Sequence, residues 1–434
     1  MSEVRPLCGI RYNGDKVPDL AAVICPPYDV ISPAGQRALY ERSPYNFVRI
    51  EYGEEFSCDT EADNKYVRAA THFGEWLTNG VLTEDATPAF YVHDHYFAYH
   101  GREYRRRGLV CRVRLEEWER MIVRPHENTT VAPKGDRMRL LGALGANTSP
   151  VMAMYRDGSG EIARRLIAVA AGEPVASSSL ADGERHELFA ISHPGEITCL
   201  EKAFAALPLY IADGHHRYES ALANRLANRA HNPSAPTDSS FNFVLMTLVD
   251  MDDPELLILP PHRLLRGLAP AKLAELEARL GDFFDIDEMT LSAHGVWQAV
   301  DVLHERSDGL RLVLVGPNDR LRILTLRDFD VASRLIPGHH TDIYKKMDVS
   351  LVDHIILEEM MGVEVDDAEA VVFNYDREDT IQKVISSDCQ LAFIVKPVSP
   401  DVIKDISDAQ DRMPRKSTYF YPKLPSGLIV HRVA

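Results

Sequence analysis

The chain has 434 residues, enough for two or three domains or for one large domain with elaborations. Its hydrophobic content of 45% and charged content of 26% are those of an ordinary soluble globular protein. The net charge of −17 argues against a nucleic-acid partner, because a protein that binds a phosphate backbone carries a basic stripe.

The cysteines and the apolar runs predict a cytoplasmic protein. No CxxC pair occurs, so zinc-ribbon and thioredoxin-like motifs are excluded, and no signal-peptide pattern stands at the N-terminus. Buried free thiols in a reducing cytoplasm are the simple interpretation. No apolar run approaches the ~20 residues of a membrane span, so no membrane association is expected. The oligomeric state is left open.

The first predicted elements are hairpin strands and one helix. A short alternating run at 46–51 follows a turn, and helical spacing predicts a helix at 63–79. Strands are expected at 89–99 and 103–115, joined by a tight turn. The basic stretch REYRRR at 102–107 is interpreted as a solvated strand edge rather than as a binding patch.

Further along the chain, hairpins again dominate over strand–helix–strand alternation. The pattern therefore predicts an α+β fold with mixed, hairpin-rich sheets rather than a doubly wound parallel sheet. We expect a main region at 1–265 and a C-terminal α+β region at 266–434, whose terminal loop at 413–427 returns to the site. The remaining predicted helices are 137–144, 161–171, 218–229, 271–280, 348–361 and 400–409, and the remaining strands are 152–155, 187–191, 207–212, 243–249, a hairpin at 310–326, 390–396 and 428–433.

The most informative stretch is YIADGHHRYES. An apolar run leads to Asp213 and Gly214, and a glycine here permits an unusual backbone angle. His215, His216 and Arg217 are then expected in the first turn of the next helix. Unpaired N–H groups and the positive end of the helix dipole favour an anion there. Arg217 adds a planar fork suited to phosphate, and Asp213 is placed to bind Mg²⁺ or to take a proton from a hydroxyl nucleophile.

Two other interpretations of this stretch stay open. A metal site is the weaker one, because adjacent histidines on a helix point about 100° apart and rarely ligate one ion together. In the other, Asp213 only caps the helix, and His215 and His216 are surface residues. We favour the phosphate-binding turn over both.

A second candidate is the polar loop RPHENTTVAPKGDR at 124–137. Glu127 can serve as a general base or a metal ligand, while Lys134 and Arg137 can neutralise phosphate. His126 is a candidate substrate contact. The letters HENTT lack the second histidine of a zinc protease, so that class is not supported. The alternative is an ordinary solvated loop.

A third candidate is the segment MPRKSTYFYPKLPSG at 413–427. Lys416 and Lys423 are candidate phosphate ligands, and Thr418 and Tyr419 are candidate substrate contacts. The prolines stiffen the segment, which suits a loop that holds polar groups without regular hydrogen bonding. A strap that packs its aromatic side chains on the core is an alternative that is compatible with this role.

Two smaller motifs are weaker candidates. CPPYDVIS can present Tyr28 and Asp29 to a site, although a structural tight turn is favoured. PPHRLLRG offers His262 and Arg263 as an unspecific second anion contact.

In HDHYFAYH, His93 and His95 share one face of a strand and resemble an HxH metal pair. No third ligand is evident nearby. We therefore favour an exposed strand face.

Taken together, the segments PPYDVIS, HENTT…PKGDR, YIADGHHRYESA, LPPHRLL and MPRKSTYFYPKLPSGL resemble the bacterial and archaeal family catalogued as domain of unknown function 1015. They are spread over nearly the whole chain in the order typical of that family, and the last is the most specific. The chain contains no GxxxxGK[ST] loop, no GxGxxG after an early strand and no GxSxG elbow, so any phosphate chemistry uses another architecture.

The DGHHR element is also similar to the signature of free serine kinases with a ParB/sulfiredoxin-like fold. The resemblance implies a phosphate-binding core in which a donor such as ADP or ATP sits against the loop and helix start. The residues it implies are Asp213, Gly214, His215, His216 and Arg217. Outside this element the similarity is thin, so Glu127 as a catalytic carboxylate is an inference from its chemistry alone.

These observations support two hypotheses of different classes. The first is a phosphotransferase that moves a phosphoryl group from ATP, ADP or pyrophosphate, with Mg²⁺, to a small hydroxylated metabolite such as free L-serine. Asp213, Glu127 and His216 are its candidate catalytic residues. The second is a ParB-like nucleotide-binding regulator with little or no turnover. A sulfiredoxin-like reductase is remote, because no cysteine lies beside the DGHHR element.

Overall fold

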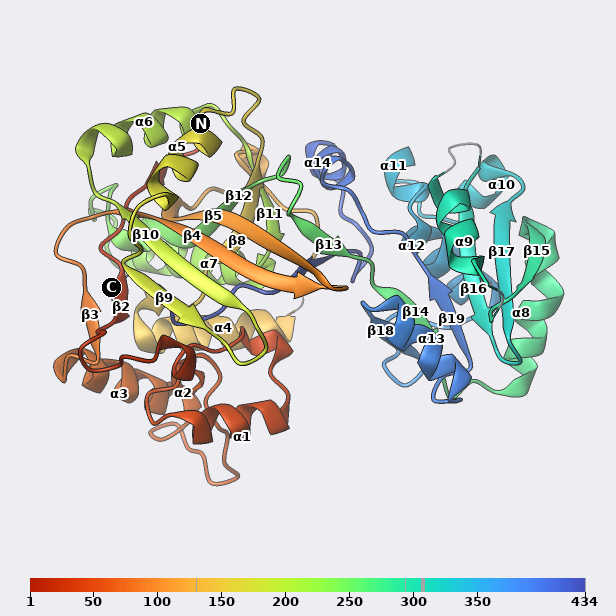
Figure 1. Cartoon of the computed structure of the whole chain (residues 1–434), viewed down its shortest axis with the longest axis horizontal. Coiled ribbons are helices and arrows are strands. Elements are labelled where there is room, and N and C mark those ends of the chain that lie inside the picture. The colour runs from red at the N-terminus through yellow and green to blue at the C-terminus, as the bar shows by residue number, and fades with distance from the viewer. Residues whose placement is uncertain (130, 293, 306–308, 434) are drawn as a thin grey trace. The chain divides into compact units, whose positions relative to one another are not determined.

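The computed structural model describes residues 1–129, 131–292, 294–305 and 309–433, and it divides into two compact units. The first unit comprises Met1–Leu257 and Pro422–Ala434, and the second comprises Ile258–Tyr421. Both combine helices with sheets, so the fold is mixed α+β (Figure 1). The boundary between the units follows Leu257 where 265 was expected, and the chain re-enters the first unit at Pro422, within the loop at 413–427 that was expected to return. Thr130 of the polar loop lies outside the described residues.

The first unit is built on a nine-stranded mixed sheet. Its strand order is β6-β11-β8-β12-β5-β4-β10-β9, and β1 pairs with β5 off this path. β11 pairs with β6 and β12 with β8 in parallel, while the other pairs are antiparallel. The strands of this unit are β1 (Val4–Arg5), β2 (Ile10–Tyr12), β3 (Leu82–Glu84), β4 (Phe90–Tyr99), β5 (Arg102–Arg114), β6 (Val123–Arg124), β7 (Ala146–Asn147), β8 (Val151–Tyr155), β9 (Ala176–Ser179), β10 (Arg185–Ile191), β11 (Leu209–Asp213), β12 (Phe243–Asp250) and β21 (His431–Arg432).

In the view of Figure 1, α5 and α6 lie above the sheet and α1–α4 lie below it. A large core joins alternate residues of the central strands to Ile162 and Leu166 of α5 and to Phe204 of α6. α4 packs against both α3 and α7. The helices are α1 (Pro33–Arg42), α2 (Val48–Glu51), α3 (Lys65–Thr78), α4 (Val131–Leu144), α5 (Glu161–Ala170), α6 (Pro194–Ala205) and α7 (His215–His231), with short turns η1 (Leu20–Ala22), η2 (Tyr28–Val30), η3 (Trp118–Arg120) and η4 (Ser240–Asn242).

The last residues of the chain, 422–433, form a strap within the first unit. The backbone of Ser426 pairs with Cys25, that of Val430 pairs with Ile10, and β21 pairs with β7. Leu428 and Ile429 pack on the sheet face that carries Tyr91, Val110 and Leu188. The strap therefore ties residues from both ends of the chain together, and its beginning places Lys423 beside β11.

The second unit is a six-stranded antiparallel sheet with the order β15-β17-β16-β19-β14-β18. Val296 and Val300 of α9 and Ile381 and Val384 of α13 pack on it. Its elements are α8 (Pro270–Phe283), α9 (Val296–Glu305), α10 (Phe329–Ser333), α11 (Asp342–Lys345), α12 (Asp348–Ser350), η5 (Leu351–Met360), α13 (Arg377–Ile385), α14 (Pro400–Asp408), β14 (His262–Leu265), β15 (Phe284–Thr290), β16 (Arg311–Gly316), β17 (Arg320–Leu326), β18 (Val371–Asn374) and β19 (Leu391–Ile394), with β13 (Leu257–Leu259) and β20 (Tyr419–Tyr421) paired as a separate ladder.

Several local predictions are corrected. The alternating run at 46–51 ends in helix α2, and the expected last strand at 428–433 is reduced to the two-residue β21 and the single bridge of Val430. The basic stretch at 102–107 is not simply solvated, because Arg106 is only 2% exposed and Arg107 donates to the buried Asp94. The thiols are also not all buried, since Cys58 is exposed.

No helix in the described ranges is long and apolar enough to cross a membrane.

Candidate functional site

The predicted strand–glycine–helix turn is present. β11 ends at Asp213, Gly214 is the N-cap with φ 90°, and α7 begins at His215. The backbone angle favours glycine here, and a Cβ on Gly214 would lie 2.8 Å from Nε of Arg217 and would displace that guanidinium. The first N–H groups of a helix have no partner within it, so this turn presents donors and a positive dipole end.

Two cations converge on Asp213 at this turn. Lys423 of the strap donates to Oδ1 and Arg217 donates to Oδ2, while Arg217 also donates to the carbonyl of Pro150. Burial alone would raise the pKa of Asp213, but Lys423 and Arg217 outweigh it and hold that pKa well below its ordinary range. Burial lowers the pKa of Lys423, yet Asp213 outweighs it and the net shift is upward. Asp213 is therefore a firmly ionised carboxylate.

His215 and His126 form a buried pair behind the turn. His126 is fully buried, its Nδ1 donates to the carbonyl of Ile211 at 2.7 Å, and its backbone N–H donates to Nε2 of His215 at 3.3 Å. The rings meet edge to face with centroids 4.7 Å apart. His215 is 5% exposed, so the interpretation of it as a surface residue is wrong. His126 positions the turn rather than facing solvent.

His216 lies among carboxylates. Burial lowers the pKa of its imidazole, while Glu219, Glu127 and Asp29 act in the opposite direction, and the net shift is downward. Glu127 is partly exposed, with Oε1 3.9 Å from Nε2 of His126. The turn therefore brings acidic groups from three separate segments near one largely neutral imidazole.

Lys134 is held by an acidic residue that the sequence did not single out. Its Nζ lies 2.9 Å from Oε2 of Glu219, and the same oxygen accepts from Thr129 Oγ1 at 2.6 Å. The expected loop at 124–137 is shorter than predicted, because α4 begins at Val131 and contains Lys134. Glu219 stands one turn into α7 and therefore fixes both Thr129 and the start of α4 against the start of α7.

Arg137 stands in a buried polar network. Its guanidinium donates to Glu51 Oε1 at 3.2 Å and to Asp136, and it lies 4.0 Å over the ring of Tyr28. Burial raises the pKa of Tyr28 to about 12. Glu51 also accepts from Thr148 Oγ1 at 2.5 Å.

A small pocket opens beside this network, between α4 and α7. It is lined on its polar side by Arg137, Thr148, Ser149, Arg217 and Ser220. The polar lining of the pocket therefore extends from Arg137 to Arg217 at the start of α7.

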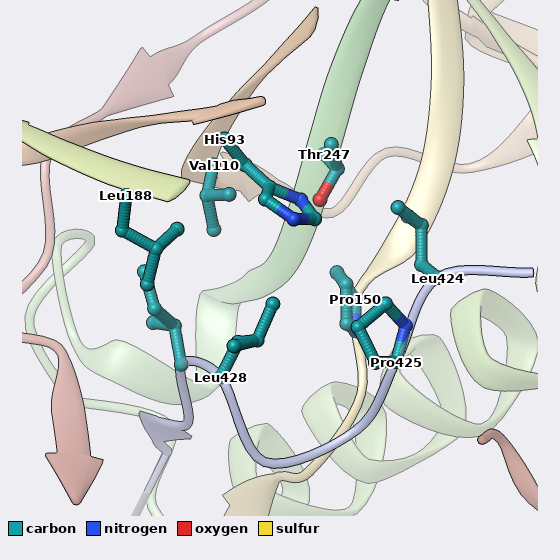
Figure 2. A pocket seen from close by; sticks show the side chains of 9 residues that line it. His93, Val110, Pro150, Leu188, Thr247, Leu424, Pro425 and Leu428 are labelled. Carbon is teal, nitrogen blue, oxygen red and sulfur yellow. The ribbon is translucent and has the colours of Figure 1, made fainter. Parts of the chain in front are cut away.

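A second pocket lies beneath the strap on the same unit. Figure 2 shows His93 and Thr247 facing Leu424, Pro425 and Leu428 of the strap. His93 is 3% exposed and His95 is fully buried, so the prediction of an exposed strand face for them is wrong. The strap covers that face.

The structure gathers most of the predicted site residues of the first unit around Asp213. Oδ2 of Asp29 lies 3.9 Å from Nζ of Lys423, and the ring of Tyr28 lies under the guanidinium of Arg137. Reasoning from sequence missed Glu219, Glu51 and Thr148. No local motif marks them, because each acts through a contact made only in the folded chain.

The other predicted residues belong to the second unit. Lys416 is exposed, Tyr419 stacks on Tyr375 with centroids 4.0 Å apart, and the roles of Lys416, Thr418 and Tyr419 stay predictions. The suggested anion contact at His262 and Arg263 is corrected. Arg263 is completely buried, and its guanidinium donates two hydrogen bonds of 3.0 Å to the carboxylate of Asp353.

Both oxygens of Asp213, one of the two predicted ligands for Mg²⁺, accept from Lys423 and Arg217. Mg²⁺ is usually held by one or two carboxylates together with phosphate oxygens and water, so a closed protein cage is not required. Asp213 and Glu127 are the predicted ligands. Among the described residues, the one group of three ligand atoms within 4.8 Å of one another is elsewhere, at His95, Glu184 and His186.

The fold and the turn define a two-unit α+β protein with a cationic, carboxylate-anchored helix start. A family described as "Protein of unknown function (DUF1015)" matches residues 4–350, and the chain belongs to this family. No curated protein matches.

Similar solved structures include a conserved hypothetical protein from Pyrococcus furiosus, 13% identical with a TM-score of 0.35, covering 74% of this chain and 93% of that one. A free serine kinase in complex with AMP is 12% identical with a TM-score of 0.34, covering 72% and 86%. SbnI from Staphylococcus aureus, with a C-terminal truncation, is 9% identical with a TM-score of 0.34, covering 72% and 84%.

Proposed function

We propose that the chain is a phosphotransferase that moves a phosphoryl group from ATP, ADP or pyrophosphate to a small hydroxylated metabolite, with free L-serine as the first acceptor to test. One observation carries this proposal. Lys423 and Arg217 converge on Asp213 at a glycine-initiated helix start. Phosphoryl transfer is mostly positioning and charge stabilisation, and this arrangement supplies both.

Each group around the turn has a proposed part. Arg217 and Lys423 neutralise the transferred phosphoryl group, and the N–H groups of the first turn of α7 bind its oxygens. Lys134 and Arg137 extend the positive lining. Tyr28 and Asp29 shape the acceptor side, and the buried His126 supports the turn. The resemblance of the DGHHR element supports a ParB/sulfiredoxin-like core for this arrangement.

The proton of the acceptor hydroxyl is assigned to Glu127 or His216 rather than to Asp213. A carboxylate whose pKa is held far below neutrality by two cations is a weak base. His216 is largely neutral at pH 7, because burial lowers its pKa, and a neutral imidazole can accept a proton. Asp213 holds the two cations in place and, with Glu127, is a proposed ligand for Mg²⁺. Bound Mg²⁺ would supply charge neutralisation on the phosphate oxygens.

A nucleotide-binding regulator with little turnover is the second candidate. The observation that favours it is the occupied state of Asp213, both of whose oxygens accept from cations. Cations that are already held in place by a carboxylate can bind a nucleotide phosphate without activating a hydroxyl group, and a regulator requires no more than that.

One experiment separates the two functions. The protein is incubated with Mg²⁺ and serine in three parallel reactions, containing ATP, ADP or pyrophosphate, and phosphoserine is followed by ³¹P NMR. Calorimetric titration with each donor runs beside it. Phosphoserine formation supports the phosphotransferase. Tight donor binding without serine-dependent turnover supports the regulator, and the absence of both removes the site assignment.

A further inference from the structure

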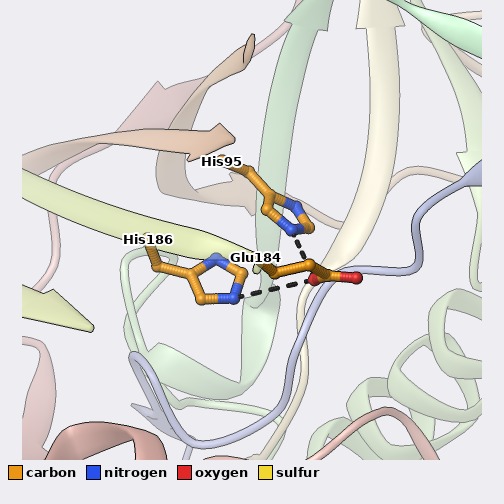
Figure 3. Close-up of side chains that lie close together, drawn as sticks. All are labelled: His95, Glu184 and His186. Atoms are coloured by element: carbon orange, nitrogen blue, oxygen red, sulfur yellow. Dashed lines mark hydrogen bonds and ion pairs between the residues drawn. The ribbon is translucent and has the colours of Figure 1, made fainter. Parts of the chain in front are cut away.

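A second cluster of chemistry-bearing side chains lies in the first unit, away from Asp213. His95 of β4 stands directly opposite His186 of β10 in the antiparallel register, so their side chains project from one face of the sheet. Their ring centroids are 4.2 Å apart. Glu184 precedes β10 in the turn after β9, and its carboxylate lies between the two rings (Figure 3).

We propose that His95, Glu184 and His186 form a binding site for a divalent transition-metal ion of the zinc type. Two imidazoles and a carboxylate are a ligand set that holds Zn²⁺ with one further position left open. The claim concerns metal binding alone and does not depend on the proposed phosphotransferase function.

The distances from the Glu184 carboxylate to the two imidazoles are close to those between the ligand atoms of a tetrahedral site. Oε2 of Glu184 lies 2.7 Å from Nε2 of His95 and 4.0 Å from Nε2 of His186. Ligand atoms at zinc-like distances from a tetrahedral centre are about 3.4 Å apart, a value that these two separations bracket. A rotation of the Glu184 side chain toward His186 equalises them.

The Nε2 atom of His186 provides independent evidence for a bound ion. The residue is 1% exposed, and its Nε2 has no hydrogen-bond partner in the described structure. A buried polar atom without a partner is costly and calls for a specific explanation. Nδ1 of the same ring lies 3.1 Å from Nε2 of His93, which fixes the orientation of the ring as second contacts of metal-bound histidines do.

Access to the site runs through Glu184. Both imidazoles are essentially buried, whereas 25% of the Glu184 side chain is exposed. The turn that carries it is closed by a hydrogen bond from the N–H of Leu180 to the carbonyl of Glu184 at 2.8 Å, and Gly183 adopts φ 95° within it. An ion can therefore meet the carboxylate first and then the two rings.

Arg106 disfavours metal binding by His95, so a substitution of Arg106 provides a further test of the site. Its Nη2 donates to Nδ1 of His95 at 3.1 Å, which leaves the ring proton on Nε2, where it is donated to Glu184. A metal on Nε2 moves that proton to Nδ1, so Arg106 must turn away. Replacing Arg106 by methionine should therefore tighten metal binding.

The experiment uses the full-length protein in a Cys58→Ser background, because Cys58 is exposed and its thiol competes for soft metals. After treatment with a chelator, the protein is titrated with Zn²⁺ and its metal content is measured by atomic emission. Co²⁺ serves as a spectroscopic probe. We expect one metal per chain and the intense visible absorption of four-coordinate Co²⁺.

Three variants and one control decide the assignment. His186→Ala and Glu184→Gln should weaken Co²⁺ binding by at least about tenfold, Arg106→Met should strengthen it, and the exposed His231→Asn on α7 should leave it unchanged. Glu184→Gln keeps the side-chain shape, so it answers the question even where His186→Ala folds poorly. Unchanged affinity in Glu184→Gln, or a Co²⁺ spectrum of the six-coordinate type in the parent protein, overturns the proposal.

Discussion

Lys423 donates to the carboxylate of Asp213 across 210 residues of chain. The contact joins the C-terminal strap to the end of β11, and it leaves an ion pair whose side chains are 13% and 17% exposed. Such a pair is costly to break from one side, because the remaining charge is stranded in a poorly solvated place. The strap is thus part of the site as well as of the core.

Removing the lysine charge is the first test of this relationship. Lys423→Met should lower the free energy of unfolding by about 1–3 kcal/mol, with Arg217 moderating the loss, and should weaken donor binding by at least about tenfold. Urea unfolding and calorimetric titration measure the two effects. Lys202→Met on the exposed face of α6 is the matched control. Equal donor affinity in both variants contradicts a role for Lys423 in phosphate binding.

The same pair predicts a pH profile for stability. The pKa of Asp213 is lowered on folding, so its contribution is present above the unfolded value of about 3.9 and is lost as the pH falls below it toward the folded value. The pKa of Lys423 is raised, so its contribution is present below about 10.4 and is lost as the pH rises beyond it. The stability difference between wild type and Lys423→Met should therefore be flat from about pH 5 to 9 and shrink below about pH 4. A difference that changed markedly near pH 7 would assign the effect to another group.

The glycine at the helix start gives a second prediction. Gly214→Ala forces a side chain into φ 90° and places its Cβ 2.8 Å from Arg217 Nε, so we expect a loss of about 1–3 kcal/mol in stability together with weaker donor binding. Thermal unfolding and titration measure both. Gly74→Ala in α3, where nothing lies within 4 Å, should be neutral or stabilising by up to about 1 kcal/mol. If both substitutions behaved alike, the turn would not require glycine.

A substitution of Lys134 should weaken donor binding while changing the stability of the protein little. Its ion pair with Glu219 is partly exposed on both sides, so Lys134→Met should cost less than about 1 kcal/mol of stability. The loss of a charge-assisted contact to phosphate should nevertheless weaken donor binding by about tenfold. Glu219→Gln, which keeps the lysine and removes the competing carboxylate, should bind the donor at least as tightly as the wild type. Wild-type donor affinity in Lys134→Met would place this lysine outside the site.

The local part of the site was predictable from sequence, since a strand, a glycine and a polar helix start are encoded within YIADGHHRYES. The ion pair between Asp213 and Lys423 was not predictable from sequence. The sequence predicts Lys423 as a phosphate ligand, but its ion pair depends on where the strap lies in the folded unit. Glu219 and Glu51 carry no motif at all, because their roles arise from packing of α7 and α2.

The errors have a common physical origin. Alternation along β4 shows that His93 and His95 share a face, but it does not show which face is covered, and here the strap covers it. The groups that gather beside His95, Glu184 and His186, come from the β9–β10 turn and from β10, so they cannot be found by spacing within one strand. The expected return of the terminal loop at 413–427 is a separate case, because a stiff, polar segment can be recognised in the sequence while the residue at which it joins the first unit, Pro422, cannot.

The measurement that tests the central claim most directly is phosphoserine formation by wild type and Asp213→Asn, followed by ³¹P NMR with serine, Mg²⁺ and each of the three donors. The variant keeps the shape of the side chain and removes the charge that holds Arg217 and Lys423. We predict serine-dependent transfer by the wild type with at least one donor, reduced by at least about a hundredfold in the variant. No phosphoserine with any donor, or equal rates in the two proteins, would contradict the account.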